Sequence, residues 1–132
     1  MRARAAVAAL AAVGLGVATY LTVIHYTHTA PICTTGGCET VQHSKYALFA
    51  GVPVALLGVV AYACVLLTAA VRGLPPAVVG ALVALVGVAF SGYLLWAQLA
   101  RIHAICQWCV GNDAVAALLA VACLVRLATE PD

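Results

Sequence analysis

The sequence predicts an all-α polytopic membrane protein, a bundle of four transmembrane helices with one loop capping its extracytoplasmic end. Hydrophobic residues make up 66% of the 132-residue chain and charged residues only 8%, and the mean hydropathy is +1.13. These values lie far from those of ordinary soluble domains. Four long apolar runs, one of them interrupted by Asp113 alone, are each long enough to cross a hydrocarbon core of about 30 Å as a helix.

The spans follow from the apolar runs between charged residues. We expect them at residues 5–24, 47–71, 74–99 and 105–126, with an outer loop at 25–46. The first run is longer than the apolar core of a secretory signal and continues into LTVIHY, so we expect it to be retained as a span. Residues 1–132 are therefore predicted to form a single membrane domain, with no fused soluble domain.

The basic residues predict the orientation of the bundle. Lys and Arg are enriched in cytoplasmic loops, so the side carrying most of them is expected to be cytoplasmic, with both termini on that side. Lys45 and Arg101 are mild exceptions. We therefore expect a multi-pass protein of the plasma membrane or bacterial inner membrane. A net charge of +2 spread over both faces argues against nucleic acid as a partner. The four arginines that set the orientation are Arg2, Arg4, Arg72 and Arg126.

Four of the six cysteines collect on the predicted outer side. Two lie in the loop segment CTTGGC and two in the segment CQWC at the start of the fourth span: Cys33, Cys38, Cys106 and Cys109. A Cys-x-x-Cys pair in the first turn of a helix lies near the positive end of the helix dipole, which favours the thiolate. Cys64 and Cys123 lie deeper in their spans and are expected to be packing residues.

Two cysteine pairs on one face predict a redox relay. The two glycines of CTTGGC allow the loop pair to move, so an external dithiol could reduce it and it could then reduce the helix pair by thiol–disulfide exchange. The spans carry no Rossmann glycines, no phosphate loop and no haem-like histidine pair, so we expect no flavin and no metal. A lipid-soluble quinone is the natural electron acceptor.

These residues resemble the vitamin K epoxide reductase family, and specifically its disulfide-forming bacterial and archaeal members. The resemblance covers nearly the whole chain. It rests on YLT at residues 20–22, the loop cysteines, SKYALFAGVP at residues 44–53 followed by GVVAY, and CQWC at residues 106–109.

The resemblance implies a role for each matched residue. Cys33 would face the thiol partner, Cys38 would attack Cys106, and Cys109 would face the quinone. Ser44 would be the loop serine beside the active site. Further quinone-lining residues would be Tyr46, Phe49 and Trp108.

The implied activity is that of a quinone-dependent thiol oxidase. It would regenerate the disulfide of an extracytoplasmic partner and reduce a menaquinone, a ubiquinone or a vitamin K-like quinone. Many bacterial members carry a fused thioredoxin-like domain, which this sequence lacks, so the partner would be a separate DsbA-like or thioredoxin-like protein. The Cys-x4-Cys loop spacing is shorter than in most members.

Asp113 and the histidines leave alternatives open. Asp113 follows Cys109 by four residues and Cys106 by seven, so all three should share a helical face. The aspartate could orient the quinone or relay its protons, or it could simply hydrogen-bond neighbouring helices. Two other functions remain: an epoxide or quinone reductase of the vertebrate type, and a metal-binding membrane protein or transporter using the cysteines and histidines.

Overall fold

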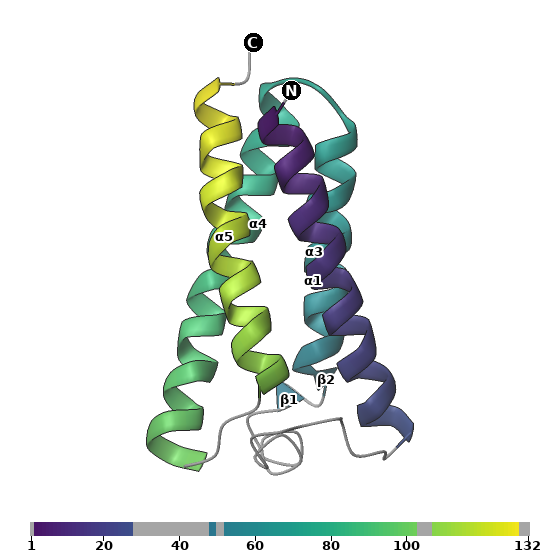
Figure 1. Ribbon diagram of the computed structural model, residues 1–132, viewed down its shortest axis with the longest axis vertical. Helices are drawn as coiled ribbons and strands as arrows, with labels where there is room; N and C mark the ends of the chain where they lie inside the picture. The colour runs from purple at the N-terminus through teal and green to yellow at the C-terminus, as the bar shows by residue number, and fades with distance from the viewer. Residues whose placement is uncertain (1, 28–47, 50–51, 103–106, 130–132) are drawn as a thin grey trace.

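The computed structural model is a bundle of four long helices with both chain ends at the same end (Figure 1). The structure describes residues 2–27, 48–49, 52–102 and 107–129. The helices are α1 (Arg2–Thr27), α3 (Val54–Ala70), α4 (Leu74–Ala97) and α5 (Gln107–Thr129), and α4 continues into a π-helix, η2 (Gln98–Ile102). An antiparallel pair of two-residue strands, β1 (Leu48–Phe49) and β2 (Val52–Pro53), precedes α3.

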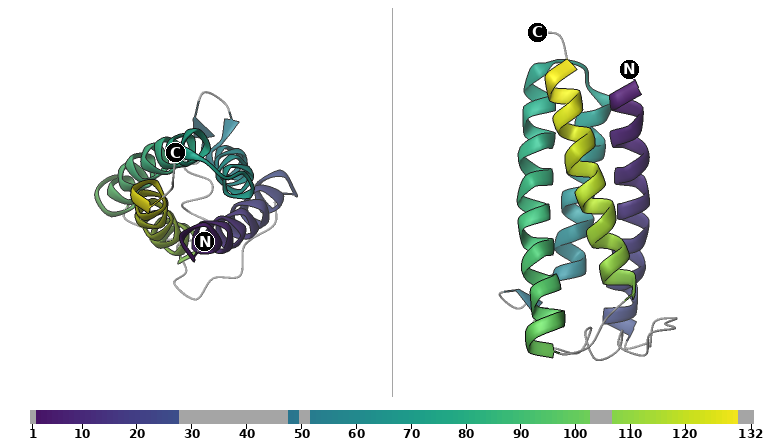
Figure 2. Two further views of the ribbon diagram at one scale, coloured as in Figure 1. Left: turned by 90° about the horizontal axis from the view of Figure 1, so that it is seen from above. Right: turned by 60° about the vertical axis from the view of Figure 1, so that its left-hand side comes forward.

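The four helices enclose a central axis when seen from above (Figure 2). α1 packs against α3 and α5, and α4 packs against the same two helices on the opposite side. The short link between α3 and α4 requires Gly73, whose φ of 122° is a conformation that side-chain-bearing residues rarely adopt. Pro75 and Pro76 follow at the first positions of α4, where a missing amide donor costs little.

The predicted all-helical class is confirmed for the described residues apart from the short strand pair. Three helices are long and apolar enough to cross a membrane, at Arg2–Ile24, Leu74–Arg101 and Gln107–Thr129. The second expected span, 47–71, differs from the structure, because helix α3 begins only at Val54 and has 17 residues. Pro53 accounts for the late start, since proline lacks the amide donor of a helix interior and disfavours helical geometry in the residue before it. Most of the loop expected at 25–46 lies outside the described residues.

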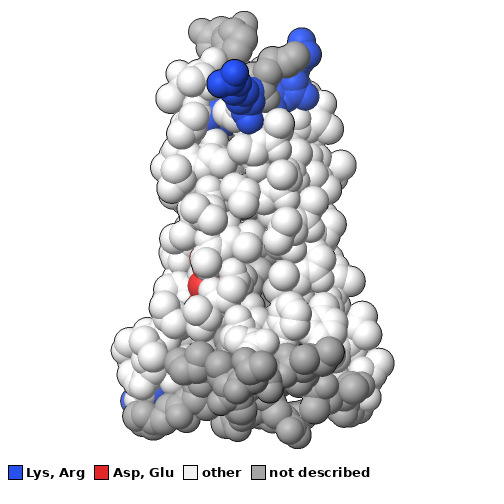
Figure 3. Space-filling model, in the orientation of Figure 1, with Lys and Arg blue, Asp and Glu red and all other residues white. Residues whose placement is uncertain are grey.

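Small side chains fill the interior of the bundle while large apolar ones face outward. Ala11, Ala81 and Ala120 are buried, whereas Leu67 and Val86 are each 69% exposed. Helices approach closely through small residues when lipid, not water, surrounds them. The exterior is therefore built to contact hydrocarbon, and on the face in Figure 3 the blue side chains gather at the top, with one small blue patch at the opposite end.

Two arginines cap the end of α3 at the end of the bundle that carries both termini. Arg126, only 2% exposed, donates from Nη1 to the carbonyl of Thr68 at 2.8 Å and from Nη2 to that of Val71 at 2.6 Å. Arg4 donates from Nε to the carbonyl of Ala69 at 3.0 Å. The last carbonyls of a helix have no partner within the helix, so these bonds satisfy them.

Replacing Arg126 with glutamine should destabilise the protein by about 3 kcal/mol, because a buried guanidinium is removed and the carbonyls of Thr68 and Val71 lose their charged donors. Arg2→Gln removes the same charge from an exposed position in α1 and should change stability by less than about 0.5 kcal/mol. Unfolding in mixed micelles, followed by circular dichroism, measures both variants. Equal losses of stability in the two would contradict the capping role of Arg126.

Aromatic side chains mark the opposite end of α4. Tyr93 and Trp96 are about half exposed, their ring centroids lie 6.1 Å apart, and the Arg101 guanidinium lies 6.0 Å from the Trp96 ring. Exposed aromatics beside a cation are typical of a membrane interface. From Leu74 to Trp96 the helix rises about 33 Å, which is close to the thickness of the hydrocarbon core, about 30 Å.

Candidate functional site

A cavity of about 650 Å³ lies between the helices, with lining residues from α1, α3, α4 and α5. Most of its wall is apolar, and it falls within the size range of small-molecule sites, roughly 300 to 1,000 Å³. Six side chains with polar or ionisable groups line it, and they come from α3, α4 with its π-helical extension, and the first two turns of α5. These are Tyr62, Ser91, Gln98, Cys109, Asn112 and Asp113.

Of the four predicted redox cysteines, Cys109 is the one that the structure describes. It is the third residue of α5, is half-buried and lines the cavity. The backbone amides of a first helical turn have no partners within the helix and create a positive potential there, which stabilises a thiolate. Cys109 is therefore positioned to present a nucleophilic sulfur to a molecule in the cavity. Four other predicted site residues lie outside the described residues: Cys33, Cys38, Ser44 and Tyr46.

Cys106, the partner of Cys109 in CQWC, also lies outside the described residues, immediately before the start of α5. Phe49 belongs to β1, which pairs with β2 ahead of α3. The predicted quinone contacts of Ser44, Tyr46 and Phe49 stay predictions.

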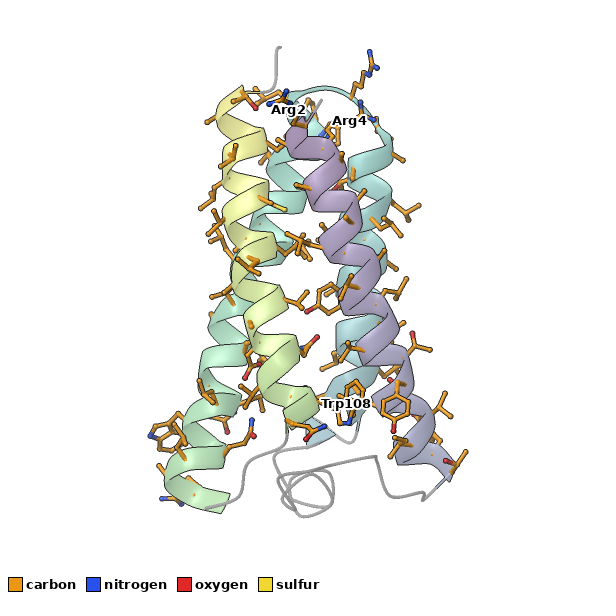
Figure 4. The ribbon with its side chains drawn as sticks, in the orientation of Figure 1. Arg2, Arg4 and Trp108 are labelled. Atoms are coloured by element: carbon orange, nitrogen blue, oxygen red, sulfur yellow. The ribbon has the colours of Figure 1, made fainter. Side chains whose placement is uncertain are left out.

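Trp108 packs against α1. Its ring centroid lies 4.9 Å from that of Tyr20, with the ring planes tilted by 52°, and Figure 4 shows it at the start of α5, between that helix and α1. Trp108 is not among the residues that line the cavity. The contact between Tyr20 and Trp108 thus joins α1 to α5. It holds the start of α5, which carries Cys109, against α1.

Asp113 shares the cavity wall with Cys109, as the four-residue spacing predicts for this pair. Ser91, from α4, hydrogen-bonds the carboxyl group of Asp113. One carboxyl oxygen, Oδ2, is buried and has no hydrogen-bond partner among the described residues. Buried polar atoms are nearly always paired, so an unpaired carboxyl oxygen in a cavity wall indicates a place for a ligand.

A comparison with known protein families indicates the general chemistry of the protein. The sequence model of the vitamin K epoxide reductase family matches residues 5–124, from α1 into the last turns of α5. The chain belongs to this family. Membership makes the protein a membrane-bound oxidoreductase with quinone-linked redox chemistry. The cavity that meets Cys109 is therefore the candidate redox site of a vitamin K epoxide reductase family protein.

In this family member, Tyr62 crosses the interior to hold Asn112. Its hydroxyl donates to Asn112 Oδ1 at 2.8 Å, and its ring lies directly against Gly14 of α1, where a Cβ atom would overlap the ring. Tyr62 is 6% exposed, so the ring has little room to move. Three helices thus fix the position of Asn112 in the cavity wall.

Gly14→Ala should displace the Tyr62 ring, break its hydrogen bond to Asn112 and destabilise the protein by about 1 to 3 kcal/mol, the range for overpacking a filled interior. Gly16→Ala is the matched control, because a Cβ at Gly16 meets nothing within 4 Å. The free energy of unfolding of both variants, measured in detergent, tests this. A Gly14→Ala variant as stable as Gly16→Ala would show that the Tyr62 ring is not held as described.

Tyr62 was noted in the sequence only as part of GVVAY, and two other polar residues of the wall were missed: Ser91 and Gln98. Isolated polar residues inside an apolar span are the signal that could have found them. Which of them face one another depends on the rotation of each helix, and the spacing within one helix does not give that.

The two cysteines deeper in the helices do not line the cavity. Cys64 is exposed on α3 and Cys123 is buried in the core formed around α5. In the part of the chain that the structure describes, no three His, Cys, Asp or Glu side chains come together as a metal site. The alternative of a metal-binding protein gains no support from those residues. Of the histidines, only His25 falls within a described helix.

Proposed function

We propose that this protein is a quinone-dependent thiol oxidase of the disulfide-forming, bacterial and archaeal type. It would take two electrons from an extracytoplasmic DsbA-like or thioredoxin-like dithiol and pass them through two cysteine pairs to a membrane quinone. The observation that carries the proposal is Cys109, which lines an apolar cavity from the first turn of a helix.

The proposal includes four membrane spans with both termini in the cytoplasm. α3 is about 25 Å long, somewhat short for the hydrocarbon core, and a bilayer adapts to such a mismatch at modest cost. The four arginines at the end that holds the termini support a cytoplasmic assignment for that end. The start of α5, with Cys109, would then face the periplasm or its equivalent.

The cavity fits a lipid-soluble quinone. Its polar side chains would meet the headgroup, and its apolar wall would accept an isoprenoid tail. Leu82 and Val86 line the cavity and are 59% and 69% exposed, so the cavity reaches the outer surface of the bundle on the α4 side. A quinone could therefore enter from the lipid without crossing water.

The proposed chemistry balances as a sequence of exchanges. The partner dithiol reduces the Cys33–Cys38 disulfide, and the Cys38 thiolate then attacks Cys106 in the Cys106–Cys109 disulfide. Each exchange breaks one S–S bond and forms another. A bound quinone supplies an acceptor for two electrons and two protons. In the last step the Cys106 and Cys109 thiols become a disulfide again, and their electrons and protons leave as quinol.

Anaerobic turnover in nanodiscs tests the proposal. Purified protein with a reduced thioredoxin-like donor and a menaquinone or ubiquinone analogue should form quinol and oxidised donor in equal amounts. Vitamin K epoxide replaces the quinone in a second arm. Turnover of the epoxide but no thiol oxidation with quinone would favour the vertebrate-type activity, and stoichiometric zinc binding without turnover would favour a metal-binding function.

A further inference from the structure

We propose that Asp113 is the acid that delivers a proton to a quinone oxygen in the cavity, held in place by Ser91. This inference rests on the proposed thiol oxidase function. It arises from the carboxyl group, which shares a cavity with a cysteine and has one buried oxygen without a partner among the described residues.

The placement of Asp113 suits proton transfer to a ring attacked at Cys109. The two residues are one helical turn apart on α5, about 6 Å along the helix axis, and both line the cavity. A quinone ring with one edge beside Cys109 would therefore bring an oxygen to the level of Asp113. Electron and proton transfer would then occur at two points of the same ring.

Ser91 restricts the orientation of the carboxyl group. It belongs to α4 and hydrogen-bonds the carboxyl group of Asp113 across the helix interface. One carboxyl oxygen, Oδ2, is buried and has no hydrogen-bond partner among the described residues. Oδ2 is therefore the atom left to carry the transferred proton.

Among the described residues, the arginines on the helices that carry Asp113 and Ser91 lie far along those helices from these two residues. Arg126 follows Asp113 by 13 residues, about 20 Å along α5, and makes its hydrogen bonds to the end of α3. Arg101 follows Ser91 by ten residues on α4 and η2, about 15 Å. Burying the Asp113 carboxylate in an apolar wall at such distances from a counter-charge costs free energy. A protonated Asp113 can instead donate a hydrogen bond to a quinone oxygen.

The two protons that quinol formation needs are both supplied by the cysteine thiols. As the Cys106 and Cys109 thiols become a disulfide, they release two electrons and two protons. One proton reaches the quinone through Asp113: the O–H bond at Oδ2 breaks as a new O–H bond forms on the quinone oxygen, and the carboxylate regains a proton released by the dithiol. The other proton goes to the second quinone oxygen.

The variant Asp113→Asn tests the proposal, because asparagine keeps the size and hydrogen-bonding capacity of the side chain without an exchangeable acid proton. We expect a short-tail ubiquinone analogue to bind within twofold of the wild-type affinity. The rate of quinol formation should fall by about 100-fold or more, the range for loss of a general acid. Reduction of the cysteine pairs by the donor, measured without quinone, should be unchanged. Asp113→Glu should recover part of the quinol rate.

Infrared difference spectroscopy gives a readout that does not depend on turnover. Reduction of the bound analogue should alter a protonated-carboxyl band in the wild-type protein, and Asp113→Asn should lack that band. Quinol formation by Asp113→Asn at the wild-type rate would overturn the proposal. A parallel loss of quinone binding, quinol-formation rate and thermal stability in Asp113→Asn would also overturn the proposal, because that pattern indicates a structural role. A wild-type protein that makes no quinol would refute the proposed function itself.

Discussion

Replacing Cys109 with serine is expected to abolish quinol formation, with a residual rate at least about 1,000-fold below that of the wild-type protein. A serine hydroxyl at neutral pH is neither a nucleophile comparable to a thiolate nor able to form a disulfide. Because Cys109 lines the cavity from the first turn of α5, no other described cysteine can take over its position. Anaerobic spectrophotometry of quinol with a reduced thioredoxin-like donor measures the rate.

Cys64→Ser is the matched control for that experiment. Cys64 is exposed on α3 and does not line the cavity, so the same chemical change there should leave the quinol rate within about twofold of wild type. Comparable losses in the two variants would mean that the electron path does not run through the cavity described for Cys109.

Gly87→Phe should raise the KM for quinone at least tenfold, about 1.4 kcal/mol in binding free energy, and should do so without unfolding the protein. Gly87 lines the cavity from α4, and a Cβ built there meets nothing within 4 Å. An aromatic ring can therefore occupy the cavity itself and exclude the quinone. Titrating the quinol rate with a short-tail quinone at fixed donor concentration measures the effect.

Gly92→Phe provides a control five residues along the same helix. A Cβ at Gly92 also meets nothing within 4 Å, but Gly92 is exposed and is not part of the cavity wall. Its KM for quinone should stay near the wild-type value. If both phenylalanines raised KM alike, or if neither did, the cavity would not be where quinone binds.

The helices were predictable from the sequence because long uncharged runs leave few alternatives to a membrane-crossing helix. The start of α3 was not predictable in this way. Residues 47–53 are apolar like the helix that follows, so hydropathy does not show that Pro53 forms part of a strand pair. Small residues such as Ala11 and Gly14 were predictable as close-packing positions only in general terms. Their particular neighbours depend on how the helices rotate against one another.

The same distinction holds for the site. A four-residue spacing within one helix was enough to predict that Cys109 and Asp113 share a wall. The hydrogen bonds of Ser91 to Asp113 and of Tyr62 to Asn112 join different helices, and no spacing in the sequence encodes their relative heights. Trp108 shows the same effect, because its contact with Tyr20 follows from the packing of α5 on α1.

The reaction of reduced protein with quinone, without added donor, tests the central claim most directly. Fully reduced protein, freed of reductant and mixed anaerobically with excess quinone, holds four electrons in its two cysteine pairs and should yield two quinols per protein, both formed at the Cys106–Cys109 pair. Peptide mapping of the quenched protein should then find a disulfide between those two residues, formed at the rate of quinol appearance. Quinol formed without that disulfide, or a disulfide formed without quinol, would contradict the account.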